Sequence, residues 1–147
     1  MPITEIILPV HNGLSQLRDG LDAVLAYTPR RDSRLFVVDD ASDPVTAAWL
    51  HRQAAAQSDW ITLQRHEENL GFLASCNGAM SQGDSDYVLL LNSDVLVSPG
   101  WLEGLLAHAE SDPRIAAVNP LSNRADNIDL PMAPGASYLA MNEYLAT

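Results

Sequence analysis

Residues 35–42 read Leu-Phe-Val-Val-Asp-Asp-Ala-Ser, and this stretch decides the fold. Its four apolar residues include two β-branched valines and one aromatic side chain, which predicts a strand buried on both faces. The acidic pair that follows ends the strand. Asp43-Pro44 then favours the start of a helix, because Asp suits the N-cap and Pro suits the first turn. A buried strand that leads into a helix is the repeating unit of parallel α/β sheets.

The segments on either side repeat this alternation. We predict strands over 3–10, 35–38, 60–65, 87–91 and 115–118, and helices over 14–28, 44–57, 72–80 and 99–109. Apolar strands joined by right-handed crossovers give a parallel sheet with helices on both faces. The expected fold class is therefore α/β, a three-layer α/β/α sandwich with a mainly parallel, Rossmann-like sheet. It would occupy residues 1–123, and residues 124–147 are expected to be irregular.

Composition and charge narrow the class of protein. The chain has 147 residues, 19 acidic and eight basic side chains, and a formal net charge of −11. Without a basic stripe, binding to nucleic acid through its phosphates is not expected, and anionic membranes would repel the surface. No run approaches about 20 apolar residues, and the N-terminus does not resemble a signal peptide. We therefore expect a cytoplasmic protein with no intrinsic membrane segment. The sequence does not indicate its oligomeric state.

Polar side chains follow three of the predicted strands. The first strand runs into His11-Asn12, the second into Asp39-Asp40, and the fourth into Asn92-Ser93-Asp94. Ligands of parallel α/β sheets bind beyond the carboxyl ends of the strands, so we expect these residues at one edge. Each motif alone is also a common turn or helix-cap sequence. Together they would cluster like charges, which is costly unless a cation or a ligand uses them.

A hard divalent cation is the expected ligand at the edge of the sheet where these strands end. Oxygen ligands suit Mg²⁺ or Mn²⁺, and magnesium is usually held by one or two carboxylates together with substrate phosphates. This fits a nucleoside-diphosphate sugar, whose leaving diphosphate the cation would neutralise. Dinucleotide and P-loop sites are excluded, because neither glycine pattern occurs. His51, His66 and His108 lack metal-ligand spacing and are expected at the surface.

Five motifs resemble, in order and spacing, the family 2 glycosyltransferases of the GT-A fold. They are Ile7-Leu8-Pro9-Val10-His11-Asn12, Val37-Val38-Asp39-Asp40-Ala41-Ser42, Asn69-Leu70-Gly71-Phe72, Ala74-Ser75-Cys76-Asn77-Gly78-Ala79 and Leu90-Leu91-Asn92-Ser93-Asp94-Val95. The chain looks most similar to O-antigen and rhamnosyltransferase-like members. The resemblance implies an inverting enzyme of cell-surface polysaccharide synthesis. It would transfer a sugar from a nucleoside-diphosphate sugar to a glycan or a lipid-linked acceptor.

The resemblance also implies roles at the nucleobase. Pro9 and His11 match the loop that lines the base, where the family usually has Tyr in place of His11. Asp40 matches the acid that accepts a hydrogen bond from the imide N–H of a pyrimidine, which favours UDP or dTDP. Asp39 would support the loop. The other positions expected to border the nucleotide are Asn12, Asn69, Gly71, Asn77, Asn92 and Ser93.

At the diphosphate, Asp94 matches the final acid of the family's Asp-x-Asp metal motif. Asn92 stands where the first acid would be, which predicts weaker metal binding. Nothing after residue 123 resembles the segment in which the family carries its acceptor site and catalytic base. The catalytic residue is therefore unknown, and the chain is expected to be the N-terminal, donor-binding portion of a transferase.

Two other classes of protein are compatible with parts of this sequence. A non-catalytic nucleotide-binding module would keep the same cleft and lack the base. A nucleotidyltransferase related to sugar-nucleotide pyrophosphorylases would share a similar α/β core. That class would need a glycine-rich loop with Arg and Lys after the first strand. Here the loop reads His11-Asn12-Gly13-Leu14 and all eight basic side chains are Arg, which disfavours this alternative.

Overall fold

Strand and helix alternate along the computed structural model of the chain, which describes residues 3–120. The chain divides into two compact units, Met1–Val95 and Leu96–Thr147. The first unit contains, in order, β1 (Thr4–Val10), α1 (Leu14–Tyr27), β2 (Ser33–Asp39), α2 (Pro44–Ala56), β3 (Ile61–Arg65), α3 (Phe72–Met80) and β4 (Tyr87–Leu90). These elements agree with those predicted for this part of the chain.

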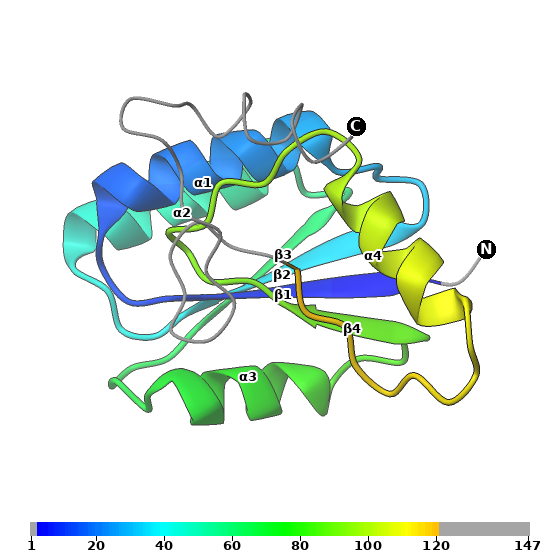
Figure 1. Cartoon of the computed structure of the whole chain (residues 1–147). Coiled ribbons are helices and arrows are strands. Elements are labelled where there is room, and N and C mark those ends of the chain that lie inside the picture. The colour runs from blue at the N-terminus through cyan, green and yellow to red at the C-terminus, as the bar shows by residue number, and fades with distance from the viewer. Residues whose placement is uncertain (1–2, 121–147) are drawn as a thin grey trace, which may run out of the picture. The chain divides into compact units, whose positions relative to one another are not determined.

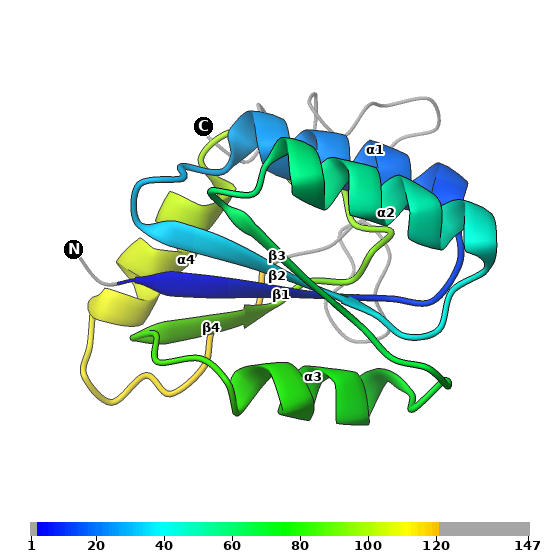
Figure 2. The ribbon, with the colours of Figure 1, turned by 180° about the vertical axis from the view of Figure 1, so that it is seen from behind.

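The four strands form one parallel sheet in the order β3-β2-β1-β4. Helices α1 and α2 cover one face of the sheet, and α3 covers the other (Figures 1 and 2). The predicted α/β/α arrangement with a parallel sheet is thus confirmed. The chain moves outward from β1 to β3 and then returns to the other side of β1. The topological switch point therefore lies between β1 and β4, where ligands of such sheets bind.

The core of the first unit lies between the sheet and its helices. β1 is buried along its whole length, and β2 is buried at all but one position. Both strands have helices on both faces, which explains why their sequences show no alternation of polar and apolar residues. In α1, Leu17, Leu21 and Val24 are buried at helical spacing. Full burial of an aliphatic side chain of this size contributes about 1.5–3 kcal/mol to stability.

Helix α2 begins as the sequence predicts. The side chain of Asp43 accepts hydrogen bonds from the N–H groups of Val45 and Thr46, both at 2.9 Å. These bonds satisfy two of the amides that a helix leaves free at its first turn. The hydrogen bond from the Thr46 amide is the largest influence on the Asp43 carboxyl, whose pKa lies below its ordinary value.

Within the described part of the second unit there is one helix, α4 (Trp101–Glu110). The strand predicted over 115–118 is wrong, because residues 115–120 have no regular structure. This run contains two alanines, which favour strands weakly, and Ile115 is exposed. A strand needs a neighbour to complete its hydrogen bonds, and a short apolar run cannot reveal whether one is present. The domain boundary expected at residue 123 and the irregular segment 124–147 lie outside the described residues.

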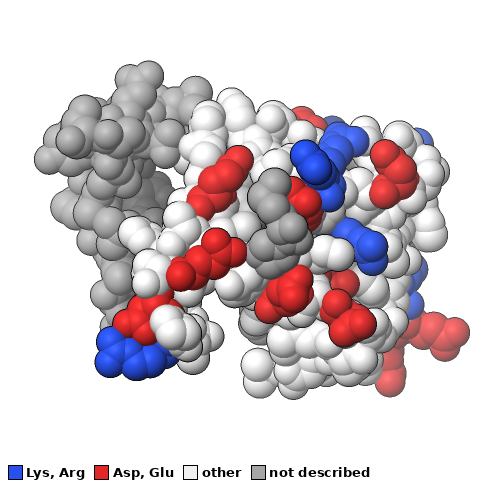
Figure 3. Space-filling view, turned by 90° about the vertical axis from the view of Figure 1, so that its right-hand side faces the viewer, with Lys and Arg blue, Asp and Glu red and all other residues white. Residues whose placement is uncertain are grey.

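Figure 3 views the chain from the side at which the strands of the first unit begin. Acidic side chains predominate on this face, with a few arginines between them. In the first unit, the strand exits lie at the opposite ends of the strands from this side. No helix in residues 3–120 combines the length and the apolar character needed to cross a bilayer.

Candidate functional site

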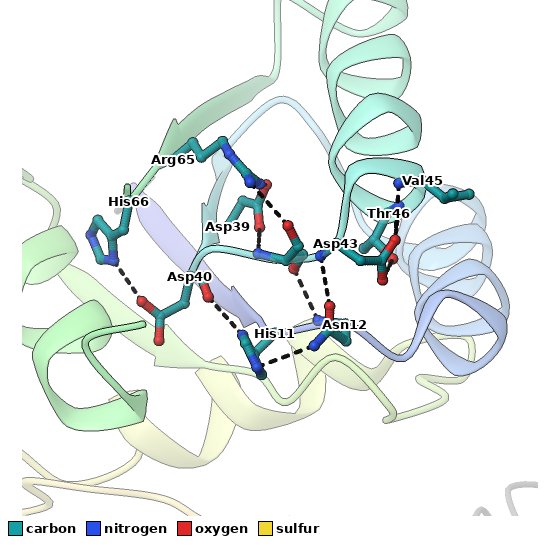
Figure 4. A network of polar contacts seen from close by, with 10 residues as sticks. His11, Asn12, Asp39, Asp40, Asp43, Val45, Thr46, Arg65 and His66 are labelled. Carbon is teal, nitrogen blue, oxygen red and sulfur yellow. Dashed lines mark hydrogen bonds and ion pairs between the residues drawn. The ribbon is translucent and has the colours of Figure 1, made fainter. Parts of the chain in front are cut away.

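The exits of β1 and β2 are joined by hydrogen bonds (Figure 4). The Asp40 N–H donates to the carbonyl of Val10 at 2.8 Å. The Asn12 N–H donates to the Ser42 hydroxyl at 2.9 Å, and the Asn12 side-chain oxygen accepts from the Asp43 N–H at 2.7 Å. The structure therefore brings together the first two of the predicted motifs.

Asp39 holds the turn that follows β2. One of its carboxylate oxygens accepts from the Ser42 N–H at 2.9 Å, and the other pairs with the guanidinium of Arg65 at the end of β3. Arg65 also donates to the Ser42 carbonyl at 2.9 Å. The Asp39 side chain is fully buried, and a buried carboxylate is tolerated only when it is paired in this way. Both of its oxygens have protein partners, which fits the supporting role expected from the resemblance.

Asp40 points away from Asp39, toward the connection between β3 and α3 (Figure 4). Its Oδ1 accepts from the Leu70 N–H at 2.9 Å and lies 2.8 Å from His66 Nδ1. Its Oδ2 accepts from the Gly71 N–H at 2.8 Å. A carboxylate offers about four acceptor positions, and three of those of Asp40 have donors among the described residues.

The charge of Asp40 is set by two opposing effects. Burial is the largest single influence and raises the pKa of the carboxyl. The hydrogen bonds from His66, Leu70 and Gly71 together outweigh it and hold the pKa below its ordinary value. Asp40 is therefore an ionised group that fixes the loop leading into α3.

His11 connects three loops through its two ring nitrogens. Nδ1 lies 2.7 Å from the Asp40 carbonyl oxygen. A carbonyl can only accept, so Nδ1 carries the proton. Nε2 must then accept in the neutral ring, and it lies 3.1 Å from the Asn12 side-chain nitrogen and 3.2 Å from that of Asn69.

The orientations of these two amides support that assignment, which rests on the hydrogen-bond network. The side-chain oxygens of Asn12 and Asn69 accept from the backbone N–H groups of Asp43 and Gly71. A backbone N–H can only donate, so both NH₂ groups must face His11 Nε2. Both nitrogens of the exposed His11 ring are therefore occupied, and its ring face is what it offers to a ligand.

The loop after β4 differs from this network. The Leu91 N–H continues the strand pairing by donating to the Ile7 carbonyl at 2.9 Å, and the Val95 N–H closes a turn onto the Asn92 carbonyl at 3.3 Å. The side chains of Asn92 and Asp94 are exposed. The Asp94 carboxylate makes no hydrogen bond or ion pair with any other described residue. Its four acceptor positions are thus free at the exit of the strand beside β1.

These donors can be tested against the expected cation. Within residues 3–120 there is no group of three His, Cys, Asp or Glu side chains placed to hold a metal. One carboxylate and one amide are hard oxygen donors of the type that Mg²⁺ and Mn²⁺ prefer. They fit a cation whose remaining ligands are phosphate oxygens and water, and they do not form a complete protein cage.

The other expected residues are spread around the network. Pro9 is buried within β1, where it pairs in register with Val38, so His11 is the exposed member of that loop. Ser93 is partly buried in the turn after β4. Asn77 is exposed on α3, and no hydrogen bond of the described structure connects it to the network.

Sequence reasoning missed the contribution of β3. Arg65 and His66 lie at its exit and pair with the two acids at the exit of β2. The expectation that His66 is a surface residue is wrong, since its side chain is 13% exposed and bonded to Asp40. The signal was the basic pair Arg65-His66 at the end of the third predicted strand, which lies at the same edge of the sheet as the other strand exits. Its partners became clear only from the position of β3 next to β2.

Comparison with known proteins identifies the family of this chain. Residues 5–142 match the family described as Glycosyl transferase family 2. The pre-mycofactocin glycosyltransferase of Mycobacterium tuberculosis (strain CDC 1551 / Oshkosh) is 35% identical over 116 residues, which are 78% of this chain and 22% of that protein. The putative glycosyltransferase EpsE of Bacillus subtilis (strain 168) is 28% identical over 109 residues, 74% of this chain and 39% of that protein. The chain thus spans less than half the length of these relatives.

A solved structure shares the fold. The mannosyltransferase PcManGT from Pyrobaculum calidifontis, in complex with GDP-Man and Mn²⁺, superposes with a TM-score of 0.70 at 25% identity. The match covers 78% of this chain and 34% of that one. The resemblance expected from the five motifs is thereby confirmed, as is the GT-A fold. The chain belongs to glycosyl transferase family 2.

Proposed function

We propose that this chain binds the nucleoside-diphosphate sugar of an inverting glycosyltransferase. The sugar would pass to a glycan or a lipid-linked acceptor in cell-surface polysaccharide synthesis. The observation that carries the proposal is the convergence of three strand exits at the switch point of the sheet. This support comes from the parallel sheet, in which the His11 ring and the Asp40 carboxylate follow β1 and β2 and the Asp94 carboxylate follows the neighbouring strand β4.

The nucleobase would lie at the exits of β1 and β2. The ring face of His11 can stack on a base, since both ring nitrogens are occupied within the protein. The free acceptor position of Asp40 would take the imide N–H of uracil or thymine, which favours UDP-linked or dTDP-linked donors. The similar mannosyltransferase was solved with GDP-Man, so a guanine nucleotide belongs in the same test.

The diphosphate would lie at the exit of β4. Asp94, with Asn92 as a weaker oxygen donor, would hold Mg²⁺ or Mn²⁺ together with the phosphate oxygens. When bound, the cation would neutralise the charge that develops on the leaving diphosphate. The complex of the similar mannosyltransferase with Mn²⁺ supports a divalent cation. Transfer also requires a base near the acceptor hydroxyl, and none of the described residues is assigned to that role.

We further propose a cytoplasmic location. Cys76 is free and buried, and a reduced thiol is compatible with the cytoplasm.

Calorimetric titration with UDP, dTDP and GDP, each with and without Mn²⁺, tests the proposal. At least one nucleotide should bind, with a pyrimidine preferred, and Mn²⁺ should tighten its binding. The matching nucleoside serves as the control, because it keeps the base and lacks the diphosphate, so Mn²⁺ should not affect it. Failure of all three nucleotides to bind in the presence of Mn²⁺ would contradict a donor site on this chain.

A further inference from the structure

Helix α1 touches the loop that carries Asp94 through a glycine. Gly20 is buried in the middle of α1. A Cβ atom placed on Gly20 would lie 3.0 Å from the Ser93 carbonyl oxygen and 3.1 Å from the Val95 carbonyl oxygen. Both are backbone atoms, so neither can turn aside as the end of a flexible side chain could. The 92–95 loop therefore rests directly on the backbone of α1.

The close approach explains a residue that is otherwise unfavourable. Glycine destabilises a helix interior relative to alanine. The φ angle of Gly20 is not positive, so the backbone there does not require glycine. Gly78, inside α3, has no atom within 4 Å of where its Cβ would lie. Of these two helical glycines, only Gly20 has neighbouring backbone atoms that leave no room for a side chain.

We propose that Gly20 is a positioning residue for Asp94. By allowing the 92–95 loop to rest on α1, it sets the place of the carboxylate relative to the nucleotide. The inference rests on the proposed function, in which Asp94 holds the cation. The loop has few constraints of its own, namely the Leu91–Ile7 hydrogen bond at its start and the turn closed by Val95. Among the described residues, the exposed side chain of Asp94 makes no hydrogen bond or ion pair that would hold it in place.

The size of the disturbance decides the expected effect. With alanine at position 20, the loop or the helix must move by a few tenths of an ångström. Metal–ligand distances in working sites are held to within about 0.2 Å. A shift of this size would therefore weaken the metal-supported part of nucleotide binding. The network around His11 and Asp40 lies at other strand exits and would keep its contacts.

The test compares Gly20→Ala with Gly78→Ala, which make the same chemical change in two helices of the same unit. For each variant, the dissociation constant of UDP, dTDP or GDP is measured with and without Mn²⁺, and thermal unfolding is recorded in parallel. We expect Gly20→Ala to lose about tenfold of the gain that Mn²⁺ gives, as is typical when the support of a metal ligand is disturbed. Its binding without metal should equal that of the unmodified chain. Gly78→Ala should change neither quantity.

The possible results separate this inference from the proposed function. If the unmodified chain gains affinity from Mn²⁺ and Gly20→Ala keeps the whole gain, the positioning role is overturned and the donor site stands. If Gly20→Ala loses binding equally with and without Mn²⁺, or loses its folded state, its role is only structural and the inference is overturned. If Mn²⁺ gives the unmodified chain no gain with any nucleotide, the metal role of Asp94 and this inference are both overturned.

Discussion

The carboxylates at the exit of β2 and the carboxylate at the exit of β4 occupy opposite environments. Asp39 and Asp40 are buried and bonded to donors from the turn after β2, from the end of β3 and from the loop before α3. Asp94 is exposed and bonded to none of the described residues. A buried carboxylate must be paired to be tolerated, whereas an exposed one remains hydrated and available.

This difference indicates that the two strand exits have different roles at this edge of the sheet. The exit of β2 is already held by hydrogen bonds within the protein, so little ordering would be required if a base binds there as proposed. The exit of β4 keeps its oxygens free, so a cation and phosphates can complete it. Substitutions at β2 should therefore affect folding and binding together, while substitutions at Asp94 should affect binding alone.

The largest expected effect comes from breaking the buried pair at β2. Asp39→Ala leaves the Ser42 N–H without its acceptor and Arg65 without its carboxylate. We expect the free energy of unfolding to fall by about 3 kcal/mol, the low end of the range for removing one member of a buried pair. Arg65 is 36% exposed, so water can partly solvate its charge when the carboxylate is removed, and the loss of stability should stay near the low end of that range. Urea denaturation measures it.

Asp94→Ala is the matched control for that experiment. It removes the same carboxylate group from a position without protein partners, so the change should stay within about 0.5 kcal/mol. Equal decreases in the free energy of unfolding of the two variants would contradict the different environments of the two carboxylates.

The next largest effect is expected at Asp40, where a substitution should change both nucleotide affinity and the stability of the loop before α3. Asp40→Ala should weaken binding of UDP or dTDP by about 1–3 kcal/mol, because a hydrogen-bond partner of the base is lost. It also removes the acceptor of the Leu70 and Gly71 amides, so the loop before α3 should exchange its amide hydrogens faster. Calorimetry and hydrogen exchange measure the two effects. Unchanged affinity together with faster exchange would limit Asp40 to a structural role.

A smaller and more selective effect is expected at β4. Asp94→Asn keeps the shape of the side chain and removes the charge that would attract a cation. The gain in nucleotide affinity on adding Mn²⁺ should disappear, while binding without metal and the urea midpoint should stay unchanged. Titrations with and without Mn²⁺ measure this. Metal-dependent binding that survives the substitution would place the cation elsewhere.

Much of the fold could be predicted from the sequence, because its elements are specified locally. The apolar run over 35–38 and the Asp43-Pro44 helix start were recognisable from neighbouring residues alone. The strand over 115–118 failed because pairing depends on a neighbour that is remote in sequence. An apolar run shows a preference for strand structure, but it does not show which other strand it would pair with.

The candidate site was predictable only in part, for the same reason. Parallel strands end at the same edge of the sheet, so the contact of His11-Asn12 with the segment that begins at Asp39-Asp40 followed from the fold class. The pairing of Arg65 with Asp39 depends on β3 lying beside β2. The contact of Gly20 with the 92–95 loop depends on how closely α1 approaches it. Neither contact can be predicted from the residues that are neighbours in the sequence.

The smallest expected effect is the pH dependence that Asp40 contributes. Although burial raises its pKa, the hydrogen bonds from His66, Leu70 and Gly71 hold the pKa below the ordinary value. A group with a lowered pKa in the folded state adds stability above its unfolded pKa, which is about 3.9 for Asp. That stability is lost as the pH falls through the folded value. The contribution should therefore be complete at neutral pH and disappear below about pH 4.

Because Asp43 and Asp112 also have lowered pKa values, acid unfolding of the unmodified chain alone does not isolate Asp40. The informative quantity is the difference between the unmodified chain and Asp40→Asn, followed by urea denaturation from neutral pH down to the acid limit. The variant should start less stable, and the gap should narrow as the pH falls, since acid removes from the unmodified chain what the substitution has already removed. Parallel curves would show that the charge of Asp40 does not stabilise the loop before α3.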